Sequence, residues 1–202
     1  MECAPSPVRG RPRQFDPEQA LAAALQVFWR KGYEGASLSE LTEAMGITRP
    51  SLYACFGNKE ALFRKALDLY ERDKLCYMRS ALQAPTARGV AQRLLEGSLA
   101  LQTGQSDPRG CLGVISAVAC TTYNETMKDE VMARIAQSDE ELLQRMIRAR
   151  EEGDFGAGHD PVALVFFLKA VLQGMGVQAS LGASPAQLRH LMETTLALWP
   201  GR

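Results

Sequence analysis

The stretch SLSELTEAMGITRPSLYACFGNK, residues 37–59, predicts two short helices joined by a tight turn. Ser37 is followed three residues later by Glu40, a spacing in which a hydroxyl and a carboxylate satisfy free backbone donors at a helix start. Gly46 ends this first helix, because glycine takes the left-handed conformation without steric cost. Thr48 is placed to cap the next helix. The turn is therefore about three residues long, as a helix-turn-helix motif requires.

The second helix, residues 49–56, has an apolar side and an outward side. We expect Leu52 and Phe56, four residues apart, to be buried. The outward and flanking positions are Arg49, Pro50, Ser51, Tyr53 and Ala54. Arginine bonds guanine in a fork, small side chains let a helix approach base edges, and proline or alanine contacts a thymine methyl. The pattern favours a helix that lies in the major groove of DNA; two ordinary core helices are the alternative.

The residues after this helix indicate a phosphate contact. Asn58 is placed to cap a further helix, and Lys59 lies in its first turn. A lysine is unfavourable at the positive end of a helix dipole. A bound phosphate would remove this conflict, because the backbone N–H groups and the ammonium would share it.

Two segments upstream complete the N-terminal unit. Residues 15–33 predict a helix, with Asp16 as its cap and Pro17 at the first helical position. The apolar residues of this helix share one face. Three helices can thus close a small core. Before them, Arg11 and Arg13 alternate with glycine and proline in VRGRPRQ, which predicts an extended basic arm that follows phosphates or enters a minor groove. A solubilising disordered terminus is the alternative.

Residues 10–70 resemble the N-terminal DNA-binding domain of TetR/AcrR-type transcriptional repressors. The resemblance is carried by the GRPR arm, by FWRKGYEGAS, and by the block SLSELTEAMGITRPSLYACFGNKEALF. It implies base-proximal or groove-facing roles for Arg49, Pro50, Ser51 and Tyr53, and phosphate contacts by Ser37, Thr48, Tyr53 and Lys59. Cys55 departs from the pattern, because the family often has a histidine or tyrosine there that helps hold the DNA backbone.

The rest of the chain reads as helices. With 202 residues, 46% of them hydrophobic, it can bury a sizeable core. We expect a fourth helix running to about residue 82. Five more are expected over about residues 86–103, 111–123, 128–152, 161–181 and 184–199. The predicted fold is all-α, with about nine helices and a DNA-binding domain over residues 1–57. The resemblance implies that residues 58–202 form a ligand-binding and dimerisation domain.

The last two expected helices carry more apolar surface than one buried face requires. Burial at the centre of one chain would explain this. The resemblance implies instead that the pair docks on a twofold copy as a four-helix bundle, so that two recognition helices read a palindrome one DNA turn apart. The predicted dimer contacts are Phe166, Ala170, Gly174, Leu188, Met192 and Leu196.

The resemblance also implies a small-molecule inducer, apolar or electrophilic, held by the middle helices. Tyr123 and Phe167 are candidate lining residues, although most such aromatic and methionine side chains belong to plain cores. Cys111 lies beside Arg109 and at an expected helix start, two features that favour a reactive thiolate. It is therefore a candidate sensor of electrophiles or oxidants, and a small buried residue is the alternative.

Composition narrows the class of protein. The 23 basic and 23 acidic residues cancel, so only their local placement argues for DNA. We expect a cytoplasmic protein without a secretory signal or membrane span. Five cysteines without a C-x-x-C spacing favour a reducing compartment, and we expect no metal or cofactor.

The sequence predicts a regulator rather than an enzyme, because neither histidine, His159 or His190, pairs with a cysteine or carboxylate pattern. We expect a ligand-responsive repressor that binds a palindromic operator as a dimer and is released by its inducer. The alternatives are a redox- or electrophile-sensing repressor acting through Cys111, a ligand-independent DNA-binding protein, and an activator of the same fold.

Overall fold

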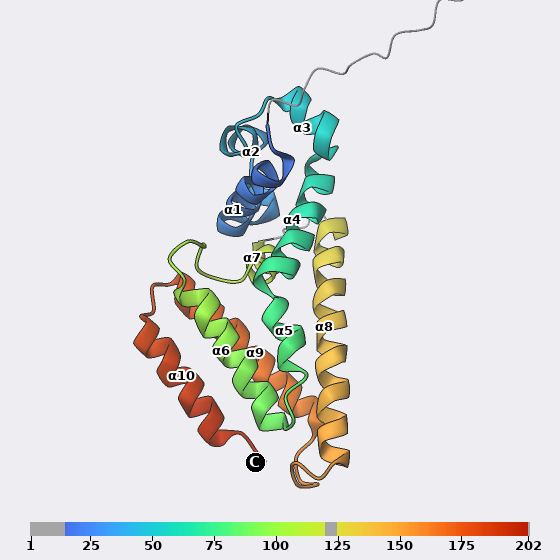
Figure 1. Ribbon diagram of the computed structural model, residues 1–202, viewed down its shortest axis with the longest axis vertical. Coiled ribbons are helices and arrows are strands. Elements are labelled where there is room, and N and C mark those ends of the chain that lie inside the picture. Colours follow the sequence, from blue (N-terminus) through green and yellow to red (C-terminus); the bar gives the residue numbers. More distant parts are fainter. Residues whose placement is uncertain (1–14, 120–124, 202) are drawn as a thin grey trace, which may run out of the picture.

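The computed structural model describes residues 15–119 and 125–201, and every regular element in this part of the chain is an α-helix (Figure 1). The ten helices are α1 Pro17–Gly35, α2 Leu38–Ala44, α3 Arg49–Phe56, α4 Lys59–Lys74, α5 Cys76–Ala81, α6 Ala87–Thr103, α7 Leu112–Ala119, α8 Glu125–Glu151, α9 Pro161–Ser180 and α10 Pro185–Leu198. The all-α prediction is confirmed. The count exceeds nine because the predicted fourth helix breaks at Leu75, whose φ of −104° and ψ of 8° are not helical.

The helix starts follow the sequence signals. Asp16 caps α1 by accepting a hydrogen bond from the backbone N–H of Glu18 at 2.9 Å. Ser37 and Glu40 form both hydrogen bonds of the capping box at the start of α2. Near the end of α1, Gly32 has φ 69° and ψ 178°, which kinks the helix before the turn into α2. Glycine adopts this conformation readily because it has no Cβ atom, which explains why a glycine occupies position 32.

The first of two hydrophobic cores, the N-terminal core, joins α1–α4 with parts of α7 and α8. Its centre is aromatic: Phe28 meets Phe63 edge-to-face at 5.0 Å between ring centroids, and Trp29 meets Tyr70 at 4.7 Å. Each such fully buried ring contributes about 1.5–3 kcal/mol of burial free energy. Because α4 supplies two of these rings, the predicted division after residue 57 cuts through this core.

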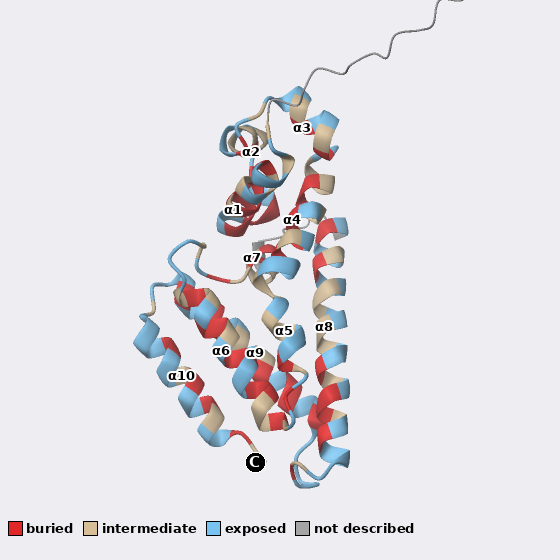
Figure 2. Cartoon of the chain, viewed as in Figure 1, coloured by how far each residue is buried: buried red, intermediate tan, exposed pale blue. Residues whose placement is uncertain are grey.

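The second core, the C-terminal core, is formed by α5, α6, α9, α10 and the C-terminal half of α8 (Figure 2). Helix α8 belongs to both cores. Its Met127 and Val131 are buried in the N-terminal core, and its Leu142 and Met146 in the C-terminal core. With 27 residues, α8 is about 40 Å long and links the two cores without a break.

Helix α9 packs one face against α6 and α8 and leaves the other face open. Among the described residues it is the one helix long and apolar enough to cross a membrane by length and composition, and 33% of its most apolar window is buried inside the chain. We name its open face the α9 stripe. The stripe consists of Val162, Phe166, Ala170, Gly174, Val177 and Leu181.

The apolar side of α10 faces inward, which corrects part of the predicted dimer surface. Leu188 is only 2% exposed and Met192 only 8%, both within the C-terminal core of their own chain. Leu196 is half-buried and packs against the same core. These side chains pack against α6 and its neighbours in the same chain, so Leu188 and Met192 are not available to a partner.

Candidate nucleic-acid interface

Helices α2 and α3 and the first turn of α4 lie together at one end of the molecule (Figure 1). Leu52 and Phe56 of α3 are buried in the N-terminal core, as predicted. The opposite side of α3 therefore faces solvent. Its exposed residues are Arg49, Pro50, Tyr53 and Ala54, and Ser51 is half-buried.

The start of α3 presents two hydroxyl groups that bond to each other. Thr48 caps the helix by accepting a hydrogen bond from the backbone N–H of Ser51 at 3.3 Å. The two side-chain oxygens are 3.0 Å apart, and either one can be the donor. Since only one hydroxyl hydrogen is used between them, the other hydroxyl hydrogen is left for a phosphate or a base edge.

Arg49 is held by a residue of α2. Its Nη2 donates a hydrogen bond to Ser39 Oγ at 2.7 Å, across the turn between the two helices. The guanidinium has five N–H donors, so this bond leaves donors for the two-pronged contact with guanine. Ser39 was not singled out from the sequence, because ten residues separate it from Arg49 and no periodicity connects them.

Ser37 makes more hydrogen bonds within its own chain than the sequence predicted. Its backbone N–H and its hydroxyl both donate to Glu40 Oε2, at 3.1 Å and 2.8 Å. Lys31 of α1 also donates to this carboxylate. The hydrogen bond from Lys31, with that from the Ser37 backbone, lowers the pKa of Glu40 to about 2. A phosphate contact by the Ser37 hydroxyl would therefore compete with an ionised Glu40.

Lys59 lies in the first turn of α4, which Asn58 caps by accepting from the backbone N–H of Ala61 at 2.8 Å. The ammonium sits over the ring of Tyr33 from α1, 4.4 Å from the ring centroid. Burial lowers the pKa of Lys59, while the charge of Glu34 acts in the opposite direction. The cation–π contact holds the ammonium near the helix start, where a phosphate would complete its charge partners.

A loop between α6 and α7 ties this end of the molecule to the C-terminal core. Trp29 Nε1 donates to the backbone carbonyl of Gly110 at 2.8 Å, and the N–H of Gly110 donates to Gln102 Oε1 of α6 at 2.7 Å. In the same loop, Asp107 accepts from Lys74 of α4 at 2.6 Å. Movement of this loop would therefore pull on α1 and α4 together.

Cys111 and Phe167, the two candidate sensing residues that the structure describes, contact different neighbours. Cys111 is half-buried beside this loop, where it accepts a weak hydrogen bond from Tyr70 at 3.7 Å between oxygen and sulfur. Burial, and then the neighbouring Cys111, raises the pKa of Tyr70, so this phenol remains a donor. Phe167 instead stacks on Trp199, with ring centroids 6.3 Å apart.

Three predicted residues fall outside the described part of the chain: Arg11, Arg13 and Tyr123. Besides Ser39, two more residues that the sequence did not single out belong to the candidate interface: Lys31 beside the capping box and Tyr33 under Lys59. The one available signal was the run RKGYEG, which places a cation and an aromatic ring just before the motif.

Comparison with known proteins agrees with this arrangement. Residues 20–66 match the family described as "Bacterial regulatory proteins, tetR family", and residues 91–195 match "Tetracyclin repressor-like, C-terminal domain". The HTH-type transcriptional repressor ComR of Escherichia coli (strain K12) is 34% identical over 195 residues, which cover 95% of this chain and 92% of ComR. BdcR, an HTH-type transcriptional repressor of the same organism, is 28% identical over 91% of this chain and 88% of its own.

A solved structure extends the likeness to a DNA complex. A cysteine mutant of CifR, a TetR family transcriptional regulator, is complexed with 26bp double-strand operator DNA and is 43% identical to this chain. The TM-score is 0.88, over 94% of this chain and 100% of the CifR chain. The arrangement of α2 and α3, the helical C-terminal core and the similarity to these relatives indicate the same family. The chain belongs to the TetR family of bacterial transcriptional regulators.

Proposed function

We propose that this DNA-binding transcriptional repressor acts in the cytoplasm as a homodimer on a palindromic operator, and that a small molecule bound by its C-terminal domain releases it. The observation that carries the proposal is the exposed α9 stripe, in a chain whose helix α3 also presents an open side to solvent. Phe166 in the first half of the stripe is 75% exposed, and Leu181, just after the last residue of α9, is 76% exposed, which is unusual for large apolar side chains.

A second copy of the chain is the occupant that suits the stripe. Ala170 and Gly174 lie on it between the larger residues, and a Cβ built at Gly174 meets no atom within 4 Å. Small residues at such positions let two helices approach closely. A twofold axis at α9 that runs along the length of the molecule would also place two α3 helices on the same side, as the reading of a palindrome requires.

The proposed DNA contacts divide by chemistry. Arg49, Pro50, Ser51 and Tyr53 would face the bases or the groove wall, because they are the outward residues of α3. Thr48 and Lys59 would bind phosphates, with Ser37 in competition with Glu40. Arg11 and Arg13 would supply further phosphate or minor-groove contacts.

Release requires two states of the dimer. A ligand lowers operator affinity only if it binds more tightly to the state whose recognition helices do not match the half-sites. The bonds from Trp29 to Gly110 and from Lys74 to Asp107 support the α6–α7 loop as a route for this change.

Cys111 supports a second candidate, release by an electrophile. Its half-buried thiol lies against Tyr70 of α4, and a Cβ at Gly176 of α9 would come within 3.5 Å of its own Cβ. Added bulk on this sulfur would press on both helices. It would do so at the junction between the two cores.

The experiment that tests the proposal combines a selection with a release assay. Wild-type protein selects bound fragments from random DNA, and gel retardation then measures its affinity for the selected sequence. The expected result is a palindromic site bound by a dimer, and loss of the complex with at least one member of a panel of apolar and electrophilic compounds. Selection of a non-palindromic site by a monomer contradicts the dimeric reading. An affinity that no compound changes contradicts ligand control.

A further inference from the structure

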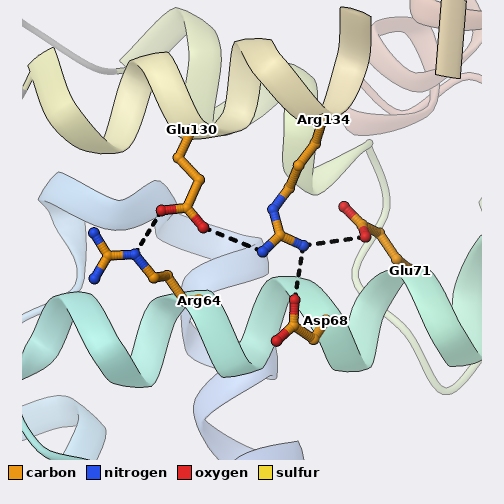
Figure 3. Close-up of polar contacts among 5 residues, drawn as sticks. All are labelled: Arg64, Asp68, Glu71, Glu130 and Arg134. Atoms are coloured by element: carbon orange, nitrogen blue, oxygen red, sulfur yellow. Dashed lines mark hydrogen bonds and ion pairs between the residues drawn. The ribbon is translucent and has the colours of Figure 1, made fainter. Parts of the chain in front are cut away.

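Five charged side chains join α4 to α8 (Figure 3). Arg134 of α8 is the centre: its Nη1 lies 2.8 Å from Asp68 Oδ1 and 3.1 Å from Glu71 Oε2, both on α4. Its Nη2 lies 3.1 Å from Glu130 Oε1 on α8, and the other oxygen of Glu130 lies 2.5 Å from Arg64 Nε on α4. The charges alternate along this chain of contacts, so each group has an opposite partner. We name these five residues the α4–α8 network.

Arg134 and Glu130, at the middle of the network, are more sheltered than an ordinary surface ion pair. The Arg134 side chain is 26% exposed, against 58% for Arg148, which pairs with Glu152 at the end of α8. Burial alone would raise the pKa of Glu130, but hydrogen bonds from Arg64 and Arg134 outweigh it and lower that pKa. Glu130 is therefore ionised at neutral pH. Because one guanidinium serves three carboxylates, the side-chain entropy of Arg134 is lost only once for three contacts.

The two helices have different mechanical roles. Helix α4 follows the recognition helix α3 directly, and it shares the N-terminal core through Leu62 and Phe63. It therefore moves with α2 and α3, which together with the first turn of α4 we call the reading end. Helix α8 continues past Arg134 into the C-terminal core, where Leu142 and Met146 are buried.

The direct connection from α4 to α5 is not a continuous helix. Helix α4 ends at Lys74, and the non-helical backbone of Leu75 separates it from α5. A change of direction at this joint would move the reading end relative to α9 and to any twofold axis there. The α6–α7 loop holds α1 and the end of α4, and the α4–α8 network holds the middle of α4.

We infer that Arg134 is a positioning residue for DNA reading: through the α4–α8 network it holds α4 against α8 and so sets the separation of the two recognition helices in the dimer. This inference rests on the proposed function, because only a dimer has such a separation. Loss of the network should leave contacts to the bases of each half-site unchanged. It should loosen the demand for one particular distance between half-sites.

The test measures affinity for operators of different spacing. The selected operator is compared with versions that carry one base pair more or less at the centre of the palindrome. Wild-type protein, Arg134→Gln and the control Arg148→Gln are measured on all three. Arg148→Gln removes the same charge from the same helix but breaks only the local pair with Glu152. A double variant, Arg134→Glu with Asp68→Arg, keeps the net charge of the network and restores one pair across the helices.

For wild-type protein and Arg148→Gln we expect a strong preference for the selected spacing. For Arg134→Gln we expect this preference to shrink about tenfold, which corresponds to a coupling of about 1.4 kcal/mol, and we expect the double variant to recover part of it. Thermal melting of each variant shows whether it is folded. Arg134→Lys provides a second folded variant, with one charge but no fork, and its preference should lie between those of wild type and Arg134→Gln.

The outcomes separate the inference from the proposed function. If wild-type protein binds all three spacings equally, the dimeric reading of a palindrome is wrong and the inference falls with it. If wild type discriminates and folded Arg134→Gln and Arg134→Lys discriminate equally well, the inference alone is wrong. Equal weakening on all spacings would likewise assign Arg134 a merely structural role.

Discussion

In the proposed function, Arg49 reads a base, and its side chain is already held in place before DNA binds. The bond to Ser39 restricts a long side chain at the start of α3, so less side-chain entropy is lost when the guanidinium meets a base. The same bond would have to lengthen if the guanidinium turned fully toward a guanine. Either way, Ser39 influences which geometry Arg49 offers to the groove.

Replacement of Arg49 by alanine should change what the protein reads. We expect Arg49→Ala to cost about 1–3 kcal/mol of operator binding and to relax the preference at one base pair in each half-site. Repeating the selection with this variant measures the change. A selection profile identical to that of wild type would refute base reading by Arg49.

Lys59→Ala should behave differently, because a phosphate contact carries no base information. We expect binding to weaken on all sequences alike, and the slope of log affinity against log salt to fall by about 1 for each phosphate that Lys59 no longer neutralises. Titrations at several salt concentrations measure that slope. Lys65, exposed on the same helix, offers a matched control, since Lys65→Ala removes an equal charge away from the capped first turn. Equal slopes for the two variants would contradict the phosphate contact.

Cys111 should be the thiol whose modification releases DNA. N-ethylmaleimide forms a bond between the sulfur and one alkene carbon, and the thiol proton ends on the neighbouring carbon. We expect Cys111 to react before the other cysteines and the operator complex to dissociate. Cys111→Ser should bind the operator and lose this release. Mass spectrometry and gel retardation together measure both steps.

Cys76 provides the control for accessibility, because its side chain is exposed whereas that of Cys111 is half-buried. In the Cys111→Ser variant, labelling of Cys76 should leave the operator complex intact. Release that persists in Cys111→Ser would return Cys111 to a packing role.

At the scale of elements, one close approach decides how α5 meets α6. The ring of Tyr77 lies directly on Gly97, so a Cβ built there would come 2.1 Å from Tyr77 Cδ2. Any side chain at residue 97 must displace this ring. Burial raises the pKa of Tyr77 beyond its ordinary range, as expected of a phenol packed into this position.

Gly97→Ala should therefore destabilise the protein, although alanine is otherwise the better helix former by about 1 kcal/mol. We expect a net loss of about 1–3 kcal/mol, and a fall in Tm of about 2–4 °C for each kcal/mol. Gly113→Ala in α7 is the matched control, since its Cβ would meet the nearest atom at an ordinary 3.8 Å. Calorimetry of both variants measures the difference, and a Tm raised by Gly97→Ala would show that Tyr77 moves aside without cost.

At the scale of the whole molecule, the proposed dimer would account for the open face of α9. Gly174→Leu should leave the single chain folded, because the space above Gly174 is empty, and should weaken the dimer by about 1–3 kcal/mol through overpacking. Gly158→Leu, in an exposed loop with equally open space, is the control. Sedimentation velocity at micromolar concentration measures the dimer. A wild-type protein that sediments as a monomer would show that α9 is not the interface.

Local signals in the sequence determined much of this protein. The caps at Asp16, Ser37, Thr48, Asn58 and Ser184 act within two or three residues of themselves, so the sequence alone places the helix starts. The burial of Leu52 and Phe56 follows from helical spacing, which also identifies the outward face of α3. The resemblance carried by these residues pointed to the family before any tertiary contact was known.

Tertiary structure decided what covers each helix. Periodicity shows that Leu188 and Met192 share a face of α10, but it does not say whether that face meets its own chain or another, and α6 proved to be the neighbour. The break at Leu75 has no proline or glycine to mark it. Arg134 and Asp68 are far apart in the chain, and only the packing of α8 beside α4 brings their charges to 2.8 Å. Contacts of this kind depend on the three-dimensional path of the whole chain, and no spacing along the sequence encodes them.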